Sequence, residues 1–230
     1  MDLVQRDAAW QTYRGEQIKV EGAIHVFSFQ VDTCYQAIEQ HLVLTKEELE
    51  KADRFHRKQD RESYIVGKHM SRSILSNFLG KSPSNISYQY NSRKKPYIQG
   101  IHFNTSHSGN QVYFALSQHP LGIDTEYIDP NFDFSAIAST YFSEEEAAYI
   151  GHNNSARQNF YTLWTRKEAL LKATGEGLVE MLAQVPSTGE LVEREGSTFS
   201  VTSYSPRKDY LLSLAAHPDS TAIHLWEANI

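Results

Sequence analysis

The chain has almost no cysteine, no long apolar stretch and no excess of positive charge. Cys34 is the single cysteine among 230 residues, so no disulfide can form within the chain, and we expect a reducing cytoplasmic location and no catalytic role for this thiol. No apolar run approaches the ~20 residues that a membrane helix needs. Charged residues interrupt positions 1–20, which argues against a signal peptide.

The net charge of −6 argues against nucleic acid as a partner, because general binding to it needs a basic surface. The positive charge that is present gathers in two segments. Residues 46–72 carry eight of the 22 basic residues against six acids, and Arg93–Pro96 reads RKKP. Such a run is most often a solvated helix face. It also suits a local site for a phosphorylated ligand or an acidic partner protein.

The expected elements occur twice in the same order. Each half has a strand, a helix opened by a capping box and a longer helix, over 23–29, 45–48 and 59–79, and again over 122–128, 143–146 and 155–173. The capping boxes at Thr45 and Ser143 lie 98 positions apart. Further short strands follow the long helix in both halves.

This repetition predicts an α+β fold of two similar α/β subdomains related by a pseudo-two-fold axis, residues 1–118 and 119–230. The seam between such halves is a favoured place for a ligand. Because the duplication lies within one chain, a monomer is sufficient.

Two carboxylates stand in the segment GIDTEYI of the second half. Asp124 and Glu126 are two positions apart, so strand alternation aims both at one face and Thr125 at the other, which we expect to be the core. Burying two carboxylates without a partner is costly, so a cation is expected between them unless they face solvent on an edge strand. Their counterparts in the first half are His25 and Phe27, so the pair exists only in the second copy.

A second group lies in the segment FYTLWTRKEALLKATGEGL. Trp164, Glu168 and Lys172 are spaced by four, so they form one stripe on a helix that Gly175 and Gly177 end. In the simplest interpretation Glu168 and Lys172 are an exposed ion pair worth ~0.3–0.5 kcal/mol.

A hard cation offers a different interpretation of the same residues. Mg²⁺ prefers oxygen ligands, commonly one or two carboxylates with substrate phosphates and water. Asp124, Glu126 and Glu168 together match one face of such a shell. Lys172, one helical turn beyond Glu168, would then reach a phosphate bound to the same ion.

The segment HFNTSHSG is dense in small polar side chains. Strand alternation separates His102 from His107, which argues against a shared metal site, and no G-x-S-x-G motif marks a hydrolase nucleophile. What remains is Ser106, His107 and Ser108 at a strand end, where hydroxyl and backbone donors can face an anion.

Taken together, HFNTSHSG, GIDTE and WTRKEALLKATGEGL, in this order and spacing, resemble the 4′-phosphopantetheinyl transferase family in its broad-specificity, two-fold-duplicated branch of the surfactin type. The resemblance implies transfer of the phosphopantetheine group of coenzyme A to a serine of an acidic acyl or peptidyl carrier protein. It also implies coenzyme A at the seam and Mg²⁺, or alternatively Mn²⁺, held by Asp124, Glu126 and Glu168.

The same resemblance implies a role for each matching residue. Glu168 and Lys172 are the catalytic candidates, Glu168 as general base. The implied coenzyme contacts are Lys51, Arg54, Arg61, Lys95, Pro96, Ser106, His107, Asp124 and Lys172. Two other hypotheses stay open: a Mg²⁺-dependent phosphodiesterase on coenzyme A-like substrates, and a non-catalytic module that binds coenzyme A or a carrier protein.

Overall fold

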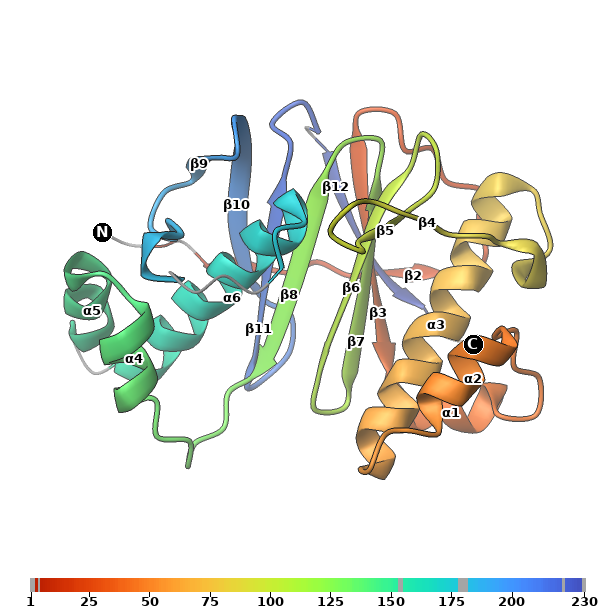
Figure 1. Cartoon of the computed structure of the whole chain (residues 1–230), viewed down its shortest axis with the longest axis horizontal. Helices are drawn as coiled ribbons and strands as arrows, with labels where there is room; N and C mark the ends of the chain where they lie inside the picture. The colour runs from red at the N-terminus through yellow and green to blue at the C-terminus, as the bar shows by residue number, and fades with distance from the viewer. Residues whose placement is uncertain (1–2, 4, 153–154, 178–181, 221, 229–230) are drawn as a thin grey trace.

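The computed structural model describes residues 3, 5–152, 155–177, 182–220 and 222–228. Two five-stranded sheets form its centre, and a long helix packs on each of them (Figure 1). The first sheet has the order β2-β12-β3-β7-β6, with β2 Gln11–Tyr13, β12 Ala222–Ala228, β3 Ala23–Gln30, β7 Gln111–Ser117 and β6 His102–Ser108. The second has the order β1-β10-β11-β8, with β9 beside β10; these are β1 Gln5–Asp7, β10 Ser197–Ser205, β11 Tyr210–Ala216, β8 Leu121–Tyr127 and β9 Leu191–Arg194.

The helices follow the predicted repetition. They are α1 Val31–Ile38, α2 Lys46–Ala52, α3 Lys58–Leu79, α4 Ser135–Tyr141, α5 Glu144–Gly151 and α6 Ala156–Thr174. The starts of α2 and α5, and of α3 and α6, each lie 98 positions apart, and the α+β duplicated fold is confirmed. Sequence analysis did not predict α1 and α4, which are short and have no side-chain cap. The short strands expected before β6 reduce to β4 Gln89–Tyr90 and β5 Pro96–Tyr97.

Apolar side chains fill the space between the sheets and beneath the helices. On β3 and β7, Phe27 and Phe114 pack toward α3, whereas Ile24 and Tyr113 pack between the two sheets. Both strands are therefore buried on both faces, which explains their nearly continuous apolar sequence. No helix within the described ranges is long and apolar enough to cross a bilayer.

Two strands cross between the halves. β12 pairs in parallel with β3 of the first sheet, and β1 pairs in parallel with β10 of the second. The 118/119 boundary therefore remains a prediction, since the folded halves share strands across it. Because β12 covers β3, His25 is closed off: it stacks on His224 and accepts a hydrogen bond from Trp226 Nε1 at 3.0 Å. Its counterpart Asp124 lies on β8, an edge strand, which explains why only the second copy carries carboxylates for a site.

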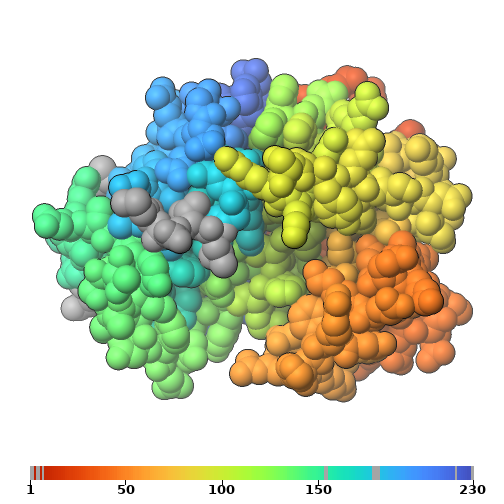
Figure 2. Space-filling view, viewed as in Figure 1, coloured from red at the N-terminus to blue at the C-terminus, as the bar shows by residue number. Residues whose placement is uncertain are grey.

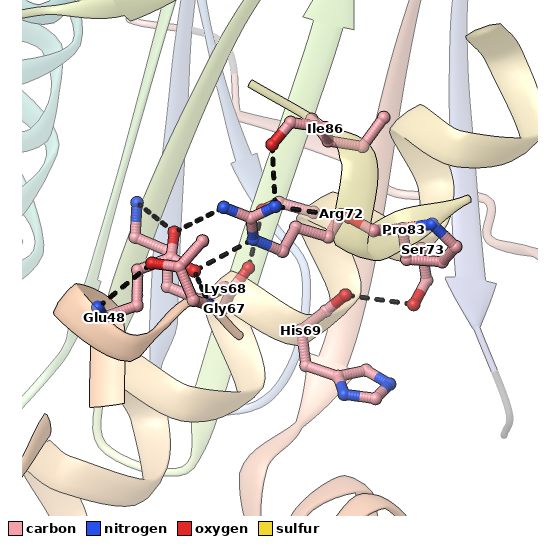
Figure 3. A network of polar contacts seen from close by, with 10 residues as sticks. Glu48, Gly67, Lys68, His69, Arg72, Ser73, Pro83 and Ile86 are labelled. Carbon is pink, nitrogen blue, oxygen red and sulfur yellow. Dashed lines mark hydrogen bonds and ion pairs between the residues drawn. The ribbon is translucent and has the colours of Figure 1, made fainter. Parts of the chain in front are cut away.

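Each capping box also anchors the long helix that follows it. Glu48 caps α2 and receives two hydrogen bonds from the buried Arg72 of α3, at 2.9 and 3.2 Å (Figure 3). Arg72 also donates to two backbone carbonyls of the turn after α3. In the second half Glu146 caps α5 and pairs with the buried Lys167 of α6 at 2.8 Å. In both halves, an ion pair between the capping glutamate of the short helix and a buried basic residue fixes how the long helix is rotated against the short one.

Candidate functional site

The edge strands β6 and β8 face each other at the seam between the two sheets. A cavity of about 420 Å³ opens there, walled by α3, β6 and β8, with Tyr88, Pro96 of β5 and Lys172 of α6 completing its lining. Figure 2 shows this face of the molecule hollowed between the orange residues of α2 and the start of α3 and the green residues of the second half. Six of the predicted site residues line the cavity: Pro96, Ser106, His107, Asp124, Glu126 and Lys172.

Helix α6 lies directly on β8 because Gly122 has no side chain. A Cβ at this position would stand 2.1 Å from the carbonyl oxygen of Ala169 and 2.3 Å from the amide nitrogen of Ala173. This close approach brings the predicted stripe of α6 over the strand: Lys172 Nζ lies 2.6 Å from Asp124 Oδ1 and 3.0 Å from Ser106 Oγ. The glycine of G-x-D-x-E is therefore part of the site's construction.

The alternation predicted for β8 is present. Asp124 and Glu126 line the cavity, and Thr125 between them also contributes to its wall. Thr125 is nevertheless buried, and its hydroxyl donates to the carbonyl of Leu211 at 2.8 Å, in keeping with the burial and hydrogen bond predicted for it.

The three carboxylates carry more negative charge than the lysine beside them offsets. Burial, together with Asp124, raises the pKa of Glu126 to about 7. Burial and then Asp124 also raise the pKa of Glu168, while Lys172 opposes the rise. Asp124 Oδ2 and Glu168 Oε1 are buried and have no hydrogen-bond partner. The site therefore has an excess of negative charge, and a bound cation would stabilise it.

These oxygens fit a hard divalent cation. Within the described ranges, no three histidine, cysteine, aspartate or glutamate side chains are grouped closely enough to hold a metal ion by themselves, and Asp124, Glu126 and Glu168 are no exception. Mg²⁺ does not need such a group, because substrate phosphates and water commonly complete its shell. The unpartnered oxygens of Asp124 and Glu168 suit such an open site. That Asp124, Glu126 and Glu168 bind one ion together remains a prediction.

Glu168 lines a second cavity, of about 320 Å³, beside the first. Pro96, Asn104 and Lys172 line both cavities. Lys172, in its ion pair with Asp124, therefore borders both cavities, whereas Glu168 lines the second and not the larger one.

Lys95 also lines the second cavity, but its ammonium group is engaged within the chain. Lys95 Nζ donates to the carbonyls of Leu121, Lys172 and Ala173 at 2.9, 2.5 and 3.1 Å. Burial lowers its pKa to about 8. These bonds join the segment before β5 to the last turn of α6, whose carbonyls have no partner within the helix.

The basic residues of the first half are only partly at the cavity. Lys51 Nζ lies 5.3 Å from the ring centroid of Tyr64, which lines the cavity. Arg54 is exposed. Arg61 is held by Asp53 at 3.1 Å and by a tyrosine hydroxyl at 3.2 Å. None of the three basic side chains lines either of these two cavities.

Sequence analysis missed the wall that α3 provides. Tyr64, Gly67, Lys68 and Ser71 line the cavity from one side of this helix. Lys68 Nζ lies 5.2 Å from the ring centroid of Tyr88, another lining residue, and burial lowers the pKa of this lysine. The signal was available: these positions recur at helical spacing within the basic segment 46–72.

Fold and site together define a duplicated α+β protein with an acidic, lysine-bearing site at the seam of its halves, suited to a phosphate ligand and a divalent cation. Comparisons with known proteins agree. Residues 120–224 match the 4′-phosphopantetheinyl transferase superfamily, and residues 33–119 match the N-terminal domain of 4′-phosphopantetheinyl transferases. The chain belongs to this superfamily, and the predicted family and enzyme class are confirmed.

Individual relatives share about a third of their aligned residues with the chain. A 4′-phosphopantetheinyl transferase of Bacillus subtilis is 32% identical over 190 residues, 76% of this chain and 84% of the relative. HetI of Nostoc sp. is 34% identical over 147 residues, 60% and 62% of the two chains. Sfp of Bacillus subtilis strain 168 is 34% identical over 140 residues, 59% and 62%. For HetI and Sfp, the aligned segment spans less than two thirds of the relative.

Proposed function

We propose that this chain transfers the 4′-phosphopantetheine group of coenzyme A to a serine of an acyl or peptidyl carrier protein and releases adenosine 3′,5′-bisphosphate. The observation that carries the proposal is the meeting of Asp124 and Glu126 of β8 with Lys172 of α6 at one cavity on the seam. The names of the relatives and the family of the chain support it.

The residues of the site divide into three roles. Asp124, Glu126 and Glu168 would hold Mg²⁺ or Mn²⁺, which when bound neutralises charge on the pyrophosphate. Lys172 donates to phosphate oxygens as negative charge builds on them, a preorganised electrostatic contribution. His107, which lines the cavity, serves as a further phosphate donor, and Ser106, predicted as another coenzyme contact, lies beside it with its hydroxyl donating to Asp124. Pro96, which lines the cavity, is a further candidate contact to the coenzyme. Contacts from Lys51, Arg54 and Arg61 remain predictions, whereas Lys95 acts by holding the last turn of α6.

Glu168 is the candidate general base. Its carboxylate takes the proton of the carrier serine as the serine oxygen forms a bond to the β-phosphorus. The bond between that phosphorus and the oxygen bridging to the α-phosphate breaks, and the electron pair leaves with the bisphosphate. In the metal-free protein burial and then Asp124 raise the pKa of Glu168, and a cation bound beside it would oppose that rise.

Mass spectrometry of an apo carrier protein, incubated with the chain, coenzyme A and Mg²⁺, tests the proposal. The expected result is a mass gain of one phosphopantetheine, lost in Glu168→Gln and retained in Glu145→Gln, a matched change at an exposed glutamate of α5. Near wild-type transfer by Glu168→Gln contradicts the roles of Glu168. Release of free phosphopantetheine without a carrier favours a phosphodiesterase, and coenzyme binding without turnover favours a binding module.

A further inference from the structure

Side chains, rather than backbone pairing, join the two sheets at the seam. Within the described ranges β6 pairs with β7 and β8 pairs with β11, and no backbone ladder connects β6 to β8. The outward amides of β8 are instead met by alternate side chains of β6. Asn104 Oδ1, Ser106 Oγ and Ser108 Oγ accept the N–H groups of residues 123, 125 and 127 at 2.9, 3.3 and 3.0 Å.

Two of these three side chains, those of Ser106 and Ser108, also donate a hydrogen bond to a carboxylate of β8. Ser106 Oγ donates to Asp124 Oδ1 at 2.9 Å, and Ser108 Oγ donates to Glu126 Oε2 at 2.8 Å. A serine hydroxyl has one proton to donate. Since each oxygen already accepts a backbone N–H, that proton is directed at the carboxylate. The backbone of β8 therefore fixes the direction in which each hydroxyl donates.

The end of β6 is held against the second half as well. The amide of Asn110 donates to the hydroxyl of Tyr210 on β11 at 3.1 Å. Gly109 has φ +54°, and a Cβ there would stand 2.4 Å from the same hydroxyl oxygen. The glycine that closes HFNTSHSG thus lets the turn approach β11, so this end of β6 is fixed against the second half.

We propose that Ser108 is a positioning residue for the reaction, which through its hydrogen bond to Glu126 orients this carboxylate toward a bound divalent cation. Asn104, on the same strand face, accepts a backbone N–H of β8 in the same way, but no hydrogen bond joins it to a carboxylate in the described structure. The inference rests on the proposed function, since it assigns a residue to the proposed metal site. It also explains why small polar residues occupy every second position of β6.

The test measures Mn²⁺ binding by its electron paramagnetic resonance signal, with coenzyme A present and no carrier protein. Ser108→Ala is expected to weaken Mn²⁺ binding by roughly tenfold or more, the usual effect of losing a partner of a metal-binding side chain. Ser197→Ala, an exposed serine on β10, should leave binding unchanged. Asn104→Ala is expected to lower the midpoint of thermal unfolding, with an effect on Mn²⁺ affinity well below that of Ser108→Ala.

A double-mutant cycle of Ser108→Ala and Glu126→Gln distinguishes an effect of Ser108 through Glu126 from a general folding defect. If Ser108 acts through Glu126, Ser108→Ala has an effect of no more than about twofold on Mn²⁺ affinity in a Glu126→Gln background. A folded Ser108→Ala protein that binds Mn²⁺ like the wild type, or full additivity in the cycle, overturns the inference and leaves the proposed function intact. If the wild-type protein binds no Mn²⁺, the proposed metal site itself fails, and the inference with it.

Discussion

Replacing Lys95 by methionine tests whether this lysine stabilises the site or binds the ligand. The ammonium donates to three carbonyls, two of them in the last turn of α6. Hydrogen bonds to a charged group contribute ~1.5–3 kcal/mol each, so their loss costs roughly 5–9 kcal/mol. Burial lowers the pKa from 10.5 to about 8, so removing the buried charge returns about 3 kcal/mol. The net loss of stability is then roughly 2–6 kcal/mol.

Thermal unfolding followed by circular dichroism measures this loss. For a chain of this size 1 kcal/mol corresponds to about 2–4 °C, so a loss near 3 kcal/mol lowers the midpoint by about 6–12 °C. Lys94→Met, at the exposed neighbouring lysine, is the matched control for stability and should keep the wild-type unfolding midpoint. The kcat of Lys95→Met should fall as well, because Lys172 lies in the turn that Lys95 holds. An unchanged midpoint with a raised KM for coenzyme A would refute this reasoning and favour direct contact with the coenzyme.

Three further predictions follow from the packing and charge of the second half. Lys167→Met leaves the carboxylate of Glu146 buried without its cation and should lower the free energy of unfolding by about 3–5 kcal/mol. Adding Glu146→Gln should restore part of this stability. Equal stability of the single variant and the wild type would contradict the prediction. Because the pKa of Glu126 is raised to about 7, the metal-free protein should lose stability as pH rises from about 4.5 to 7. Mg²⁺ should therefore raise the unfolding midpoint more at pH 8 than at pH 6, and equal rises would count against it. Gly122→Ala should force α6 away from β8 and lower kcat up to about 100-fold, since the new Cβ meets the Ala169 carbonyl; wild-type kcat would refute the close approach.

Local periodicity predicted much of the site. The alternation of a strand placed Asp124 and Glu126 on one face, and helical spacing placed Glu168 and Lys172 on one stripe. The duplicated fold followed from two capping boxes at one offset, each of which the structure confirms. Patterns of this kind depend on neighbours along the chain, which is why one sequence is enough to find them.

Contacts between distant segments were beyond such patterns. No local rule indicates that the amino group of Lys95 reaches carbonyls of α6, or that β12 returns to cover β3. The buried pairing of Lys167 with Glu146 depends on how α6 is rotated against α5, which only the packed helices determine. The side chains of β6 that bond to β8 were visible in the sequence as small polar residues at alternate positions. The groups they bond to were not, because they are backbone amides of β8, which every sequence has.

The most direct test of the account is an anomalous-difference map from crystals grown with Mn²⁺ and coenzyme A. The expected result is a manganese peak at the seam in contact with Asp124, Glu126 and Glu168, with the pyrophosphate of the coenzyme within hydrogen-bond distance of Lys172. A peak elsewhere, or a coenzyme bound away from the cavity between β6 and β8, would contradict it.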